Sequence, residues 1–321
     1  MVEMSRFGTV KGILAEGKLN YEKVFENIVN SLSEYITKAH LKSCVLGLSG
    51  GIDSCVCSII TKEACDKVGI PLIGISIPCS SNKEDENSSA NAAGKEFCHE
   101  FYTENIQDLF AFTEKTCNNA MSLTSTNISQ GNIKARLRMI YLYNIASIRG
   151  GMVISTGNFT ENILGFCTLH GDICDLDIIG NLWKTEVYDL AQWLLEKRYK
   201  GSEALKRAIE ITPTDGNGVS NSDLDQIAPG LSYFEVDNVL RIWYGLNDKI
   251  KMQWLNNHDA FNKTWALNAL ANGSSGQKPY TMENVERIIK RVLANEFKQK
   301  IMPYSINIFA DGKDPNITKL A

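Results

Sequence analysis

The residues best suited to chemistry stand together in the run LSGGIDS, residues 48–54. Its two adjacent glycines let the backbone approach an anion closely, and Ser49 and Ser54 offer hydroxyl groups beside it. A helix that begins near Asp53 adds free N–H groups and the positive end of its dipole. This chemistry suits pyrophosphate. The alternative is a tight turn in which Asp53 or Ser54 only caps the helix, but the order Ser-Gly-Gly-x-Asp-Ser after a strand favours the phosphate.

Two further charged residues lie where an anion-binding loop would use them. Glu161 follows the apolar run GGMVISTGN, residues 150–158, and Lys184 begins a helical segment. Oxygen ligands such as Asp53 and Glu161 suit Mg²⁺. Lys184 suits a phosphate group that gains negative charge during a reaction. The plainer alternatives are a solvated acid in a first helical turn for Glu161 and the start of a surface helix for Lys184.

Alternating strands and helices must position these residues. Short apolar runs predict strands at 43–49, 71–78, 100–105 and 150–158. The spacing of apolar residues predicts helices at 20–40, 53–68, 83–98, 106–120 and 132–148. This alternation implies an α/β fold with a doubly wound parallel sheet. Ligands bind at the carboxyl ends of the strands in such a sheet, where the loops 49–54 and 155–161 are expected.

The chain beyond Lys184 is predicted to be mostly helical and to complete a single domain over residues 1–321. A polar, glycine-rich loop interrupts it at 211–223. Residues 271–279 are typical of a mobile linker, and residues 311–321 of a loose tail.

Composition excludes several classes of function. The formal charge of −4 disfavours a nucleic-acid partner. No apolar run approaches the roughly 18 residues that a membrane helix needs, and the start lacks the pattern of a signal peptide. We therefore expect a cytoplasmic protein with no membrane partner. The nine cysteines lack the paired spacing of a zinc site and are expected to be reduced core residues. The run GILAEGKL, residues 12–19, nearly matches a Walker A loop, but Leu19 replaces its Ser or Thr.

The SGGxDS run resembles the signature of the PP-loop ATP pyrophosphatases, which split ATP into AMP and pyrophosphate. Blocks at 131–146, 155–172, 175–191 and 212–226 are similar, in order and spacing, to the ammonia-dependent NAD synthetases. The resemblance implies an adenine nucleotide alpha hydrolase-like fold with a helical C-terminal region. It also implies a ligase that uses Mg²⁺, ATP and ammonia to convert deamido-NAD to NAD. The nicotinate carboxylate attacks the α-phosphate, and ammonia then attacks the acyl-adenylate.

The resemblance also implies roles for individual residues. Asp53 and Lys184 would be catalytic, and Asp53 and Glu161 would hold the metal. Arg136, Asp172, Asp177 and Lys298 would bind the dinucleotide substrate. The positions expected to contact ATP are Gly47, Ser49, Gly50, Gly51, Asp53, Ser54, Thr156, Lys184 and Thr214.

Several departures from the family pattern limit this transfer. The stretch GDICDLD, residues 171–177, replaces GDGGAD, so the choice among Asp172, Asp175 and Asp177 stays open. Turn formation is the alternative for Asp172 and Asp177. Phe297 stands where bacterial relatives often have histidine. The segment CSSNKEDENSS, residues 79–89, matches poorly, so adenine contacts cannot be assigned there.

Two other regions of the sequence each have two interpretations. Lys134 and Arg138 share one helix face at i, i+4 while Arg136 lies elsewhere, so only part of this cluster can meet one ligand, and a solvated face is the alternative. Residues 241–280 are predicted to be a helical insertion. In it Trp243, Trp254 and Trp265 are expected to pack in the core or against a subunit rather than to stack on a base.

The resemblance implies a homodimer, and the segments 20–40 and 131–146 are the candidates for its contact. Three other functions are alternatives. The first is a different PP-loop ligase, which thiolates tRNA or synthesises GMP; thiolation enzymes usually need an active cysteine or a CxxC pair and a basic tRNA surface, and neither shows in this sequence. A glutamine-dependent synthetase would need an added amidohydrolase domain, for which 321 residues leave little room. A non-catalytic nucleotide-binding module would not be expected to keep Asp53, Glu161 and Lys184.

Overall fold

A computed structural model of the chain describes residues 19–120, 122–214, 223–246, 249, 251–252 and 281–299. These residues fall into two compact units. The larger unit comprises Asn20–Asn162 and Phe166–Asp223, and the smaller comprises Ile163–Gly165 and Leu224–Gln299. A single domain over residues 1–321 stays a prediction.

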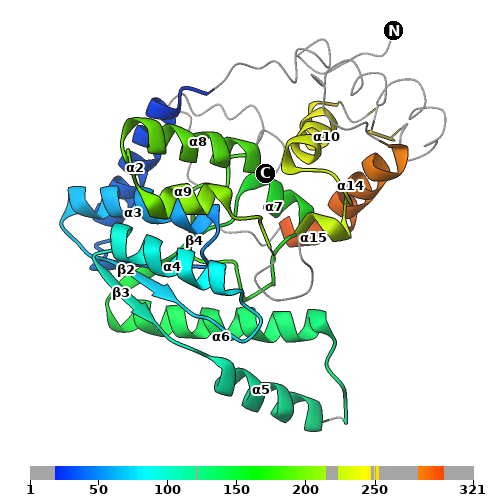
Figure 1. Ribbon diagram of the computed structural model, residues 1–321, viewed down its shortest axis with the longest axis horizontal. Helices are drawn as coiled ribbons and strands as arrows, with labels where there is room; N and C mark the ends of the chain where they lie inside the picture. The colour runs from blue at the N-terminus through cyan, green and yellow to red at the C-terminus, as the bar shows by residue number, and fades with distance from the viewer. Residues whose placement is uncertain are drawn as a thin grey trace. The chain divides into compact units, whose positions relative to one another are not determined.

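The larger unit is built on a parallel sheet of five short strands (Figure 1). They are β1 (Ser43–Gly47), β2 (Leu72–Ser76), β3 (Glu100–Thr103), β4 (Gly151–Ser155) and β5 (Leu176–Asp177), in the order β3-β2-β1-β4-β5. β1, β2 and β4 are almost wholly buried, as parallel strands covered on both faces must be. The expected doubly wound α/β sheet is confirmed.

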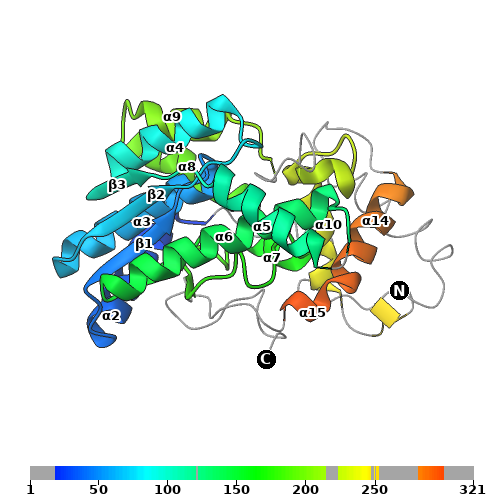
Figure 2. The same cartoon turned by 90° about the horizontal axis from the view of Figure 1, so that it is seen from below.

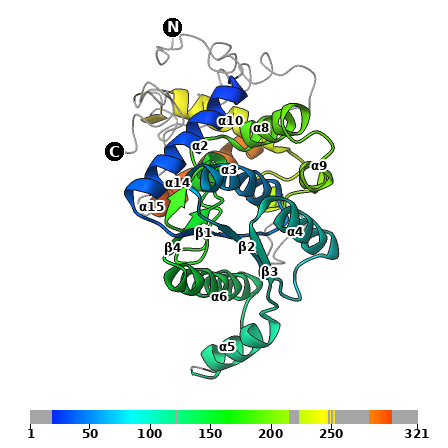
Figure 3. The ribbon, with the colours of Figure 1, turned by 90° about the vertical axis from the view of Figure 1, so that its left-hand side faces the viewer.

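Helices cover both faces of this sheet (Figure 3). One face carries α6 (Asn127–Ile148), with α5 (Gln107–Asn119) packed on its outer side (Figure 2). The other face carries α3 (Ile52–Val68) and α4 (Glu84–Phe97). An outer layer of α2 (Tyr21–Lys38), α8 (Lys184–Lys197) and α9 (Glu203–Glu210) covers α3 and α4. The helices predicted at 20–40, 53–68, 83–98 and 106–120 are thus confirmed.

The order of the strands reverses beside β1. The chain moves from β1 outward to β2 and β3, and then returns to place β4 on the other side of β1. The register aligns Leu46 with Ile154 in this pair. Because the connections leave β1 in opposite directions, their loops part at the carboxyl ends of β1 and β4, and a crevice between such loops is the usual ligand site of an open α/β sheet.

One local prediction needs correction, and two short elements were not predicted. The helix expected at 132–148 begins at Asn127, because Thr126 caps it: the Thr126 hydroxyl accepts from the Ser129 N–H at 3.2 Å. A short helix, α7 (Phe159–Leu164), follows β4. The two-residue strand β5 was not predicted, since it is too short to show a periodic pattern.

The smaller unit is helical. It contains the 3₁₀ turn η1 (Asp223–Gln226, of which Asp223 closes the larger unit), α10 (Tyr233–Gly245), α14 (Met282–Ala294) and α15 (Glu296–Gln299). The Arg291 side chain donates to the Leu164 carbonyl oxygen at 2.8 Å and so ties α14 to residues 163–165. Trp243 is buried in α10, as expected of a packing residue.

Some predictions fall on residues outside the described ones. They include Trp254 and Trp265, nearly all of 12–19 and most of 241–280. The linker at 271–279 and the tail at 311–321 lie there too. Among the described residues, no helix combines the length and apolar character needed to cross a bilayer.

Candidate active site

The SGGxDS loop connects β1 to α3 and rests on the backbone of α4. Gly50 has a φ of +89°, and a Cβ atom there would overlap the carbonyl oxygen of Glu86. The Ser89 hydroxyl donates to the Gly50 carbonyl oxygen at 2.8 Å. Only glycine combines this backbone angle with so close an approach. The first glycine of the motif therefore fixes the loop on α4.

The two serines of the loop hold its shape. The hydroxyls of Ser49 and Ser54 lie 3.2 Å apart, and the Gly51 N–H donates to Ser49 Oγ at 3.3 Å. Gly51 is the N-cap of α3 and supplies no side-chain cap. This contradicts the alternative in which Asp53 or Ser54 only caps the helix. Ser54 donates to the Gly51 carbonyl oxygen, and Asp53 takes part in a separate polar network.

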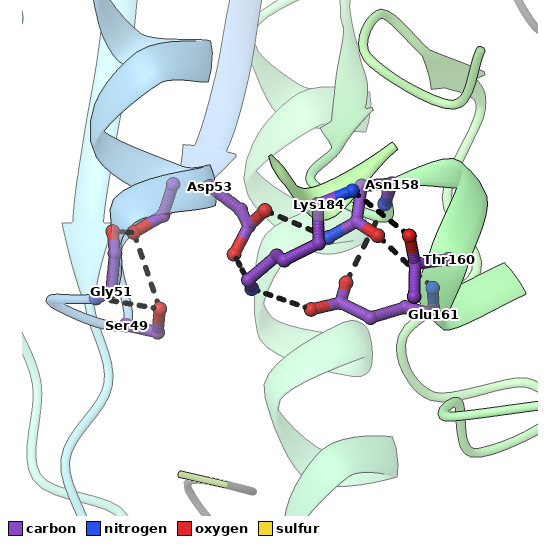
Figure 4. A network of polar contacts seen from close by, with 8 residues as sticks. Ser49, Gly51, Asp53, Asn158, Thr160, Glu161 and Lys184 are labelled. Atoms are coloured by element: carbon purple, nitrogen blue, oxygen red, sulfur yellow. Dashed lines mark hydrogen bonds and ion pairs between the residues drawn. The ribbon is translucent and has the colours of Figure 1, made fainter. Parts of the chain in front are cut away.

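That network joins Asp53, Glu161 and Lys184 (Figure 4). Lys184 Nζ lies 2.5 Å from Asp53 Oδ2 and 2.8 Å from Glu161 Oε1. The Lys184 side chain is only 3% exposed, against 15% for Asp53 and 19% for Glu161. Burial alone would lower the pKa of Lys184, but the two carboxylates hold it well above its usual value. The ammonium group is therefore charged at neutral pH, and the alternatives of a solvated acid and a surface lysine are both wrong.

Asn158 completes the network and was missed from the sequence. It is fully buried, and its Nδ2 donates to Asp53 Oδ1 at 2.8 Å while its Oδ1 accepts from the Glu161 N–H at 3.0 Å. The Asn158 side chain thus joins the Asp53 carboxylate to the backbone of Glu161 (Figure 4). Its place in the turn TGN directly after the strand was the available signal.

Two helix starts are joined to bring Lys184 to this point. The Thr160 hydroxyl in α7 accepts from the Lys184 N–H, the first of α8, at 2.9 Å. The rings of Phe159 and Trp183 meet edge to face with their centroids 4.7 Å apart. Both contacts are buried. The backbone of Lys184 is therefore fixed relative to α7, which carries Glu161.

Asp177 differs from the other acids of its stretch. It ends β5 and is buried, and burial raises its pKa to about 6 despite hydrogen bonds from Ser155 and Asn162. Its Oδ1 atom has no hydrogen-bond partner among the described residues. A buried carboxylate oxygen left unpaired is costly unless a ligand group meets it. Asp177 is thus prepared to accept a hydrogen bond.

Asp172 and Asp175 each accept hydrogen bonds from other residues of the larger unit instead. Asp172 accepts from the Thr168 N–H at 2.7 Å, which closes a turn. Asp175 accepts from the Tyr143 hydroxyl at 2.9 Å and from the Val153 N–H at 2.8 Å. Turn formation thus describes Asp172, whereas Asp175 links α6 to β4.

The basic cluster of α6 divides as the spacing predicted: Lys134 and Arg138 are buried or half-buried, and Arg136 is exposed. Arg138 donates to the Ile77 carbonyl oxygen and to Asn82 Oδ1, both at 3.0 Å, and so anchors the loop after β2. Burial lowers its pKa. Lys134 is buried with its Nζ 4.9 Å from the Phe110 ring centroid. Arg136 is exposed and donates to the Leu169 carbonyl oxygen at 3.3 Å.

Four other residues were predicted to contact ATP or the dinucleotide: Gly47, Thr156, Thr214 and Lys298. Gly47 ends β1, and Thr156 follows β4 directly. The Thr214 hydroxyl donates to the Glu86 carboxylate, beside the backbone that seats Gly50. Lys298 belongs to the smaller unit, where its Nζ donates to the Gly165 carbonyl oxygen at 2.8 Å.

The donor set at Asp53 and Glu161 suits Mg²⁺. No group of three or more His, Cys, Asp and Glu side chains arranged for a metal exists among the described residues. Mg²⁺ does not need one, because it usually takes one or two carboxylates together with substrate phosphates and water. Both carboxylates lie within hydrogen-bond distance of one nitrogen atom, so they converge on one point.

Comparison with known proteins gives a consistent result. The family model described as NAD synthase matches residues 24–302. The NH3-dependent NAD(+) synthetase of Carboxydothermus hydrogenoformans is 33% identical over 224 residues, which are 70% of this chain and 86% of that protein. The glutamine-dependent NAD(+) synthetase of Thermotoga maritima is 27% identical, and the match spans 69% of this chain and 38% of that protein. Among solved structures, the NMN synthetase of Francisella tularensis aligns with a TM-score of 0.66 at 25% identity, covering 89% of this chain and 98% of that one.

Proposed function

Because the chain belongs to the NAD synthase family, we infer that it converts deamido-NAD to NAD with ATP and ammonia, and that AMP and pyrophosphate are released. The observation that carries this inference is the pairing of the SGGxDS loop with the network of Asp53, Glu161 and Lys184. A phosphate-binding loop and convergent carboxylates and ammonium are the groups that adenylation of a carboxylate requires.

The first step is attack of the nicotinate carboxylate on the α-phosphate of ATP. The loop 49–54 binds the pyrophosphate that leaves, because its backbone N–H groups and the start of α3 favour an anion. Lys184 stabilises the negative charge that develops on the phosphate oxygens. Gly47, Thr156 and Thr214 complete the proposed contacts to ATP.

Mg²⁺, when bound, would be held by Asp53 and Glu161 and would neutralise the leaving pyrophosphate. Asn158 would help to hold both carboxylates for it: its side chain donates to Asp53 Oδ1, and its backbone N–H lies 3.4 Å from Glu161 Oε2.

The dinucleotide is bound by Asp177, and the unpaired Oδ1 atom of this residue supports the role. Asp172 has less support, because its carboxylate already accepts from the Thr168 N–H. Arg136 and Lys298 are the proposed basic contacts. Ammonia then attacks the acyl carbon, and AMP leaves. No cysteine is needed as a nucleophile: Cys57, one turn beyond Asp53, is fully buried, and burial raises its pKa well above the usual value.

The proposed assembly is a homodimer that pairs through α6 and α5. Ile128, Ile140 and Ile148 on α6 are exposed, and Phe112 on α5 is 70% exposed. In α2, the other candidate, only Tyr35 is an exposed large apolar residue, because the rest of its apolar face packs on α3 and α8. Exposed large apolar side chains on these two helices favour association.

All nine cysteines are free thiols, and five are buried. Thiols in this number fit a reducing compartment, which supports the proposed cytoplasmic location.

The test is incubation of the purified chain with ATP, Mg²⁺, deamido-NAD and ammonium, with NAD and AMP measured by chromatography. We expect both products in equal amounts. Glutamine in place of ammonium should give far less NAD. A parallel reaction on nicotinate mononucleotide checks for NMN, the product that the name of the Francisella protein indicates. Absence of NAD from neutral to alkaline pH would refute the proposed function.

A further inference from the structure

The carboxylates of Asp53 and Glu161 have all four of their oxygen atoms engaged. Lys184 Nζ contacts Asp53 Oδ2 and Glu161 Oε1. Asn158 contacts the other two: its Nδ2 donates to Asp53 Oδ1 at 2.8 Å, and its N–H lies 3.4 Å from Glu161 Oε2. No carboxylate oxygen of this pair is left without a donor.

An ammonium ion and a divalent cation compete for the two inner oxygens, Asp53 Oδ2 and Glu161 Oε1. Both are positive, and a separation of a few ångströms in a poorly hydrated site makes their repulsion large. Mg²⁺ also takes oxygen ligands, at about 2.1 Å, so it competes with Lys184 for the two oxygens that face the ammonium. Repulsion between the two cations would therefore drive Lys184 away from the carboxylates when the metal enters.

A displaced Lys184 needs another anionic partner. Its side chain is 3% exposed, so leaving its ammonium there without a counterion would be costly. The polyphosphate of ATP on the SGGxDS loop is such a partner, and it brings the oxygen ligands that Mg²⁺ requires in addition to two carboxylates. Nucleotide and metal would then enter together.

We propose that Lys184 is a built-in counterion that occupies the cation position between Asp53 and Glu161 in the nucleotide-free protein and exchanges with the metal when ATP binds. The site consequently has little affinity for a divalent cation alone. This inference rests on the proposed function, because it takes ATP and a divalent metal as the ligands.

The experiment measures Mn²⁺ binding to the nucleotide-free protein by electron paramagnetic resonance of the free ion. Lys184→Gln removes the competing charge, so its Mn²⁺ affinity should exceed that of the wild type by about tenfold or more. Lys184→Arg keeps the charge and should bind Mn²⁺ as weakly as the wild type. Lys62→Gln is the matched control, because it breaks an exposed ion pair with Asp66 (2.6 Å) and should change nothing.

Equal or weaker Mn²⁺ binding by Lys184→Gln would overturn the exchange. Loss of Lys184 could also leave the variant unstable, so its melting temperature is measured with and without Mn²⁺. A rise with Mn²⁺ that the wild type lacks supports the proposal, because the metal then replaces the missing ammonium. A variant that stays unfolded at saturating Mn²⁺ contradicts it. The NAD assay on the wild type separates failure of the exchange from failure of the proposed function. If the wild type forms NAD but Lys184→Gln gains no Mn²⁺ affinity, the exchange alone is refuted.

Discussion

Asn158 is the residue on which the geometry of the two central carboxylates depends. It is fully buried and bridges Asp53 and Glu161 through opposite ends of one amide group. Leucine has nearly the same shape but neither donor nor acceptor. It would leave Asp53 Oδ1 and the Glu161 N–H without these partners, at a cost of about 1–3 kcal/mol for each group.

We therefore expect Asn158→Leu to raise the KM for MgATP about tenfold or more and to lower kcat, with a smaller effect on the KM for deamido-NAD. Steady-state kinetics with each substrate varied in turn provides the measurement. Asn30→Leu is the control, since Asn30 accepts from Lys67 far from the site. Unchanged kinetics for Asn158→Leu would show that it does not position the carboxylates.

Asp177 makes the stability of the protein depend on pH. Burial raises its pKa from 3.8 to about 6, so between these values the folded protein binds a proton that the unfolded chain has released. The contribution of this group to the free energy of unfolding is therefore largest below about pH 4 and falls as the pH rises through about 6.

Asp177→Asn removes this titration. Relative to the wild type, its free energy of unfolding should rise by on the order of 2–3 kcal/mol between about pH 4 and pH 7. Urea unfolding at a series of pH values gives the comparison. If the difference between variant and wild type stays constant across that range, Asp177 does not titrate as a buried acid.

At the scale of elements, the contact of the SGGxDS loop with α4 determines where the anion-binding groups of the loop lie. Gly50 and Gly201 have similar backbone angles, with φ of +89° and +84°, but different surroundings. A Cβ atom at Gly50 would overlap the Glu86 carbonyl oxygen, while one at Gly201 would have nothing within 4 Å. This pair separates backbone strain from displacement of the loop.

Gly201→Ala should lower the free energy of unfolding by about 1 kcal/mol, the cost of the backbone angle alone, and keep full activity. Gly50→Ala should cost about 2–3 kcal/mol or more and abolish NAD formation, because the loop must leave α4. Chemical denaturation and the NAD assay on both variants check this. Equal effects of the two changes would mean that the contact with α4 is not required.

Elements were predictable to different degrees. The buried strands β1, β2 and β4 were evident because continuous apolar runs end at glycine or polar turns. The start of α6 was placed five residues late, since residues 127–131 (NISQG) carry no apolar period and the capping pair Thr126–Ser129 defines the start. The strand β5 has two residues and depends on its neighbour β4 for its existence.

At the scale of the whole molecule, the exposed apolar side chains of α5 and α6 predict association. Ile140 on α6 is 60% exposed, and Tyr35 on α2 is 42% exposed. A charge at the centre of a packed apolar interface is costly, whereas one outside it is solvated.

We expect Ile140→Asp to raise the dissociation constant of the dimer about a hundredfold, and Tyr35→Asp to leave it unchanged. Sedimentation velocity over a range of protein concentrations measures both. A dimer that tolerates Ile140→Asp would place the contact elsewhere. A wild type that is monomeric throughout would refute the proposed homodimer.

By itself the sequence determined the α/β class, the anion-binding loop and the family, because these depend on local order: apolar runs, adjacent glycines and a fixed series of motifs. Only the tertiary structure decided which charges meet. Lys184 contacts Asp53 across 131 residues, the Asn158 amide joins the Asp53 carboxylate to the Glu161 N–H, and Asp177 rather than its neighbours keeps a buried Oδ1 atom without a partner among the described residues. Such contacts follow from the order of strands and from burial, and the cost of desolvating a charge depends on every element around it rather than on its position in the chain.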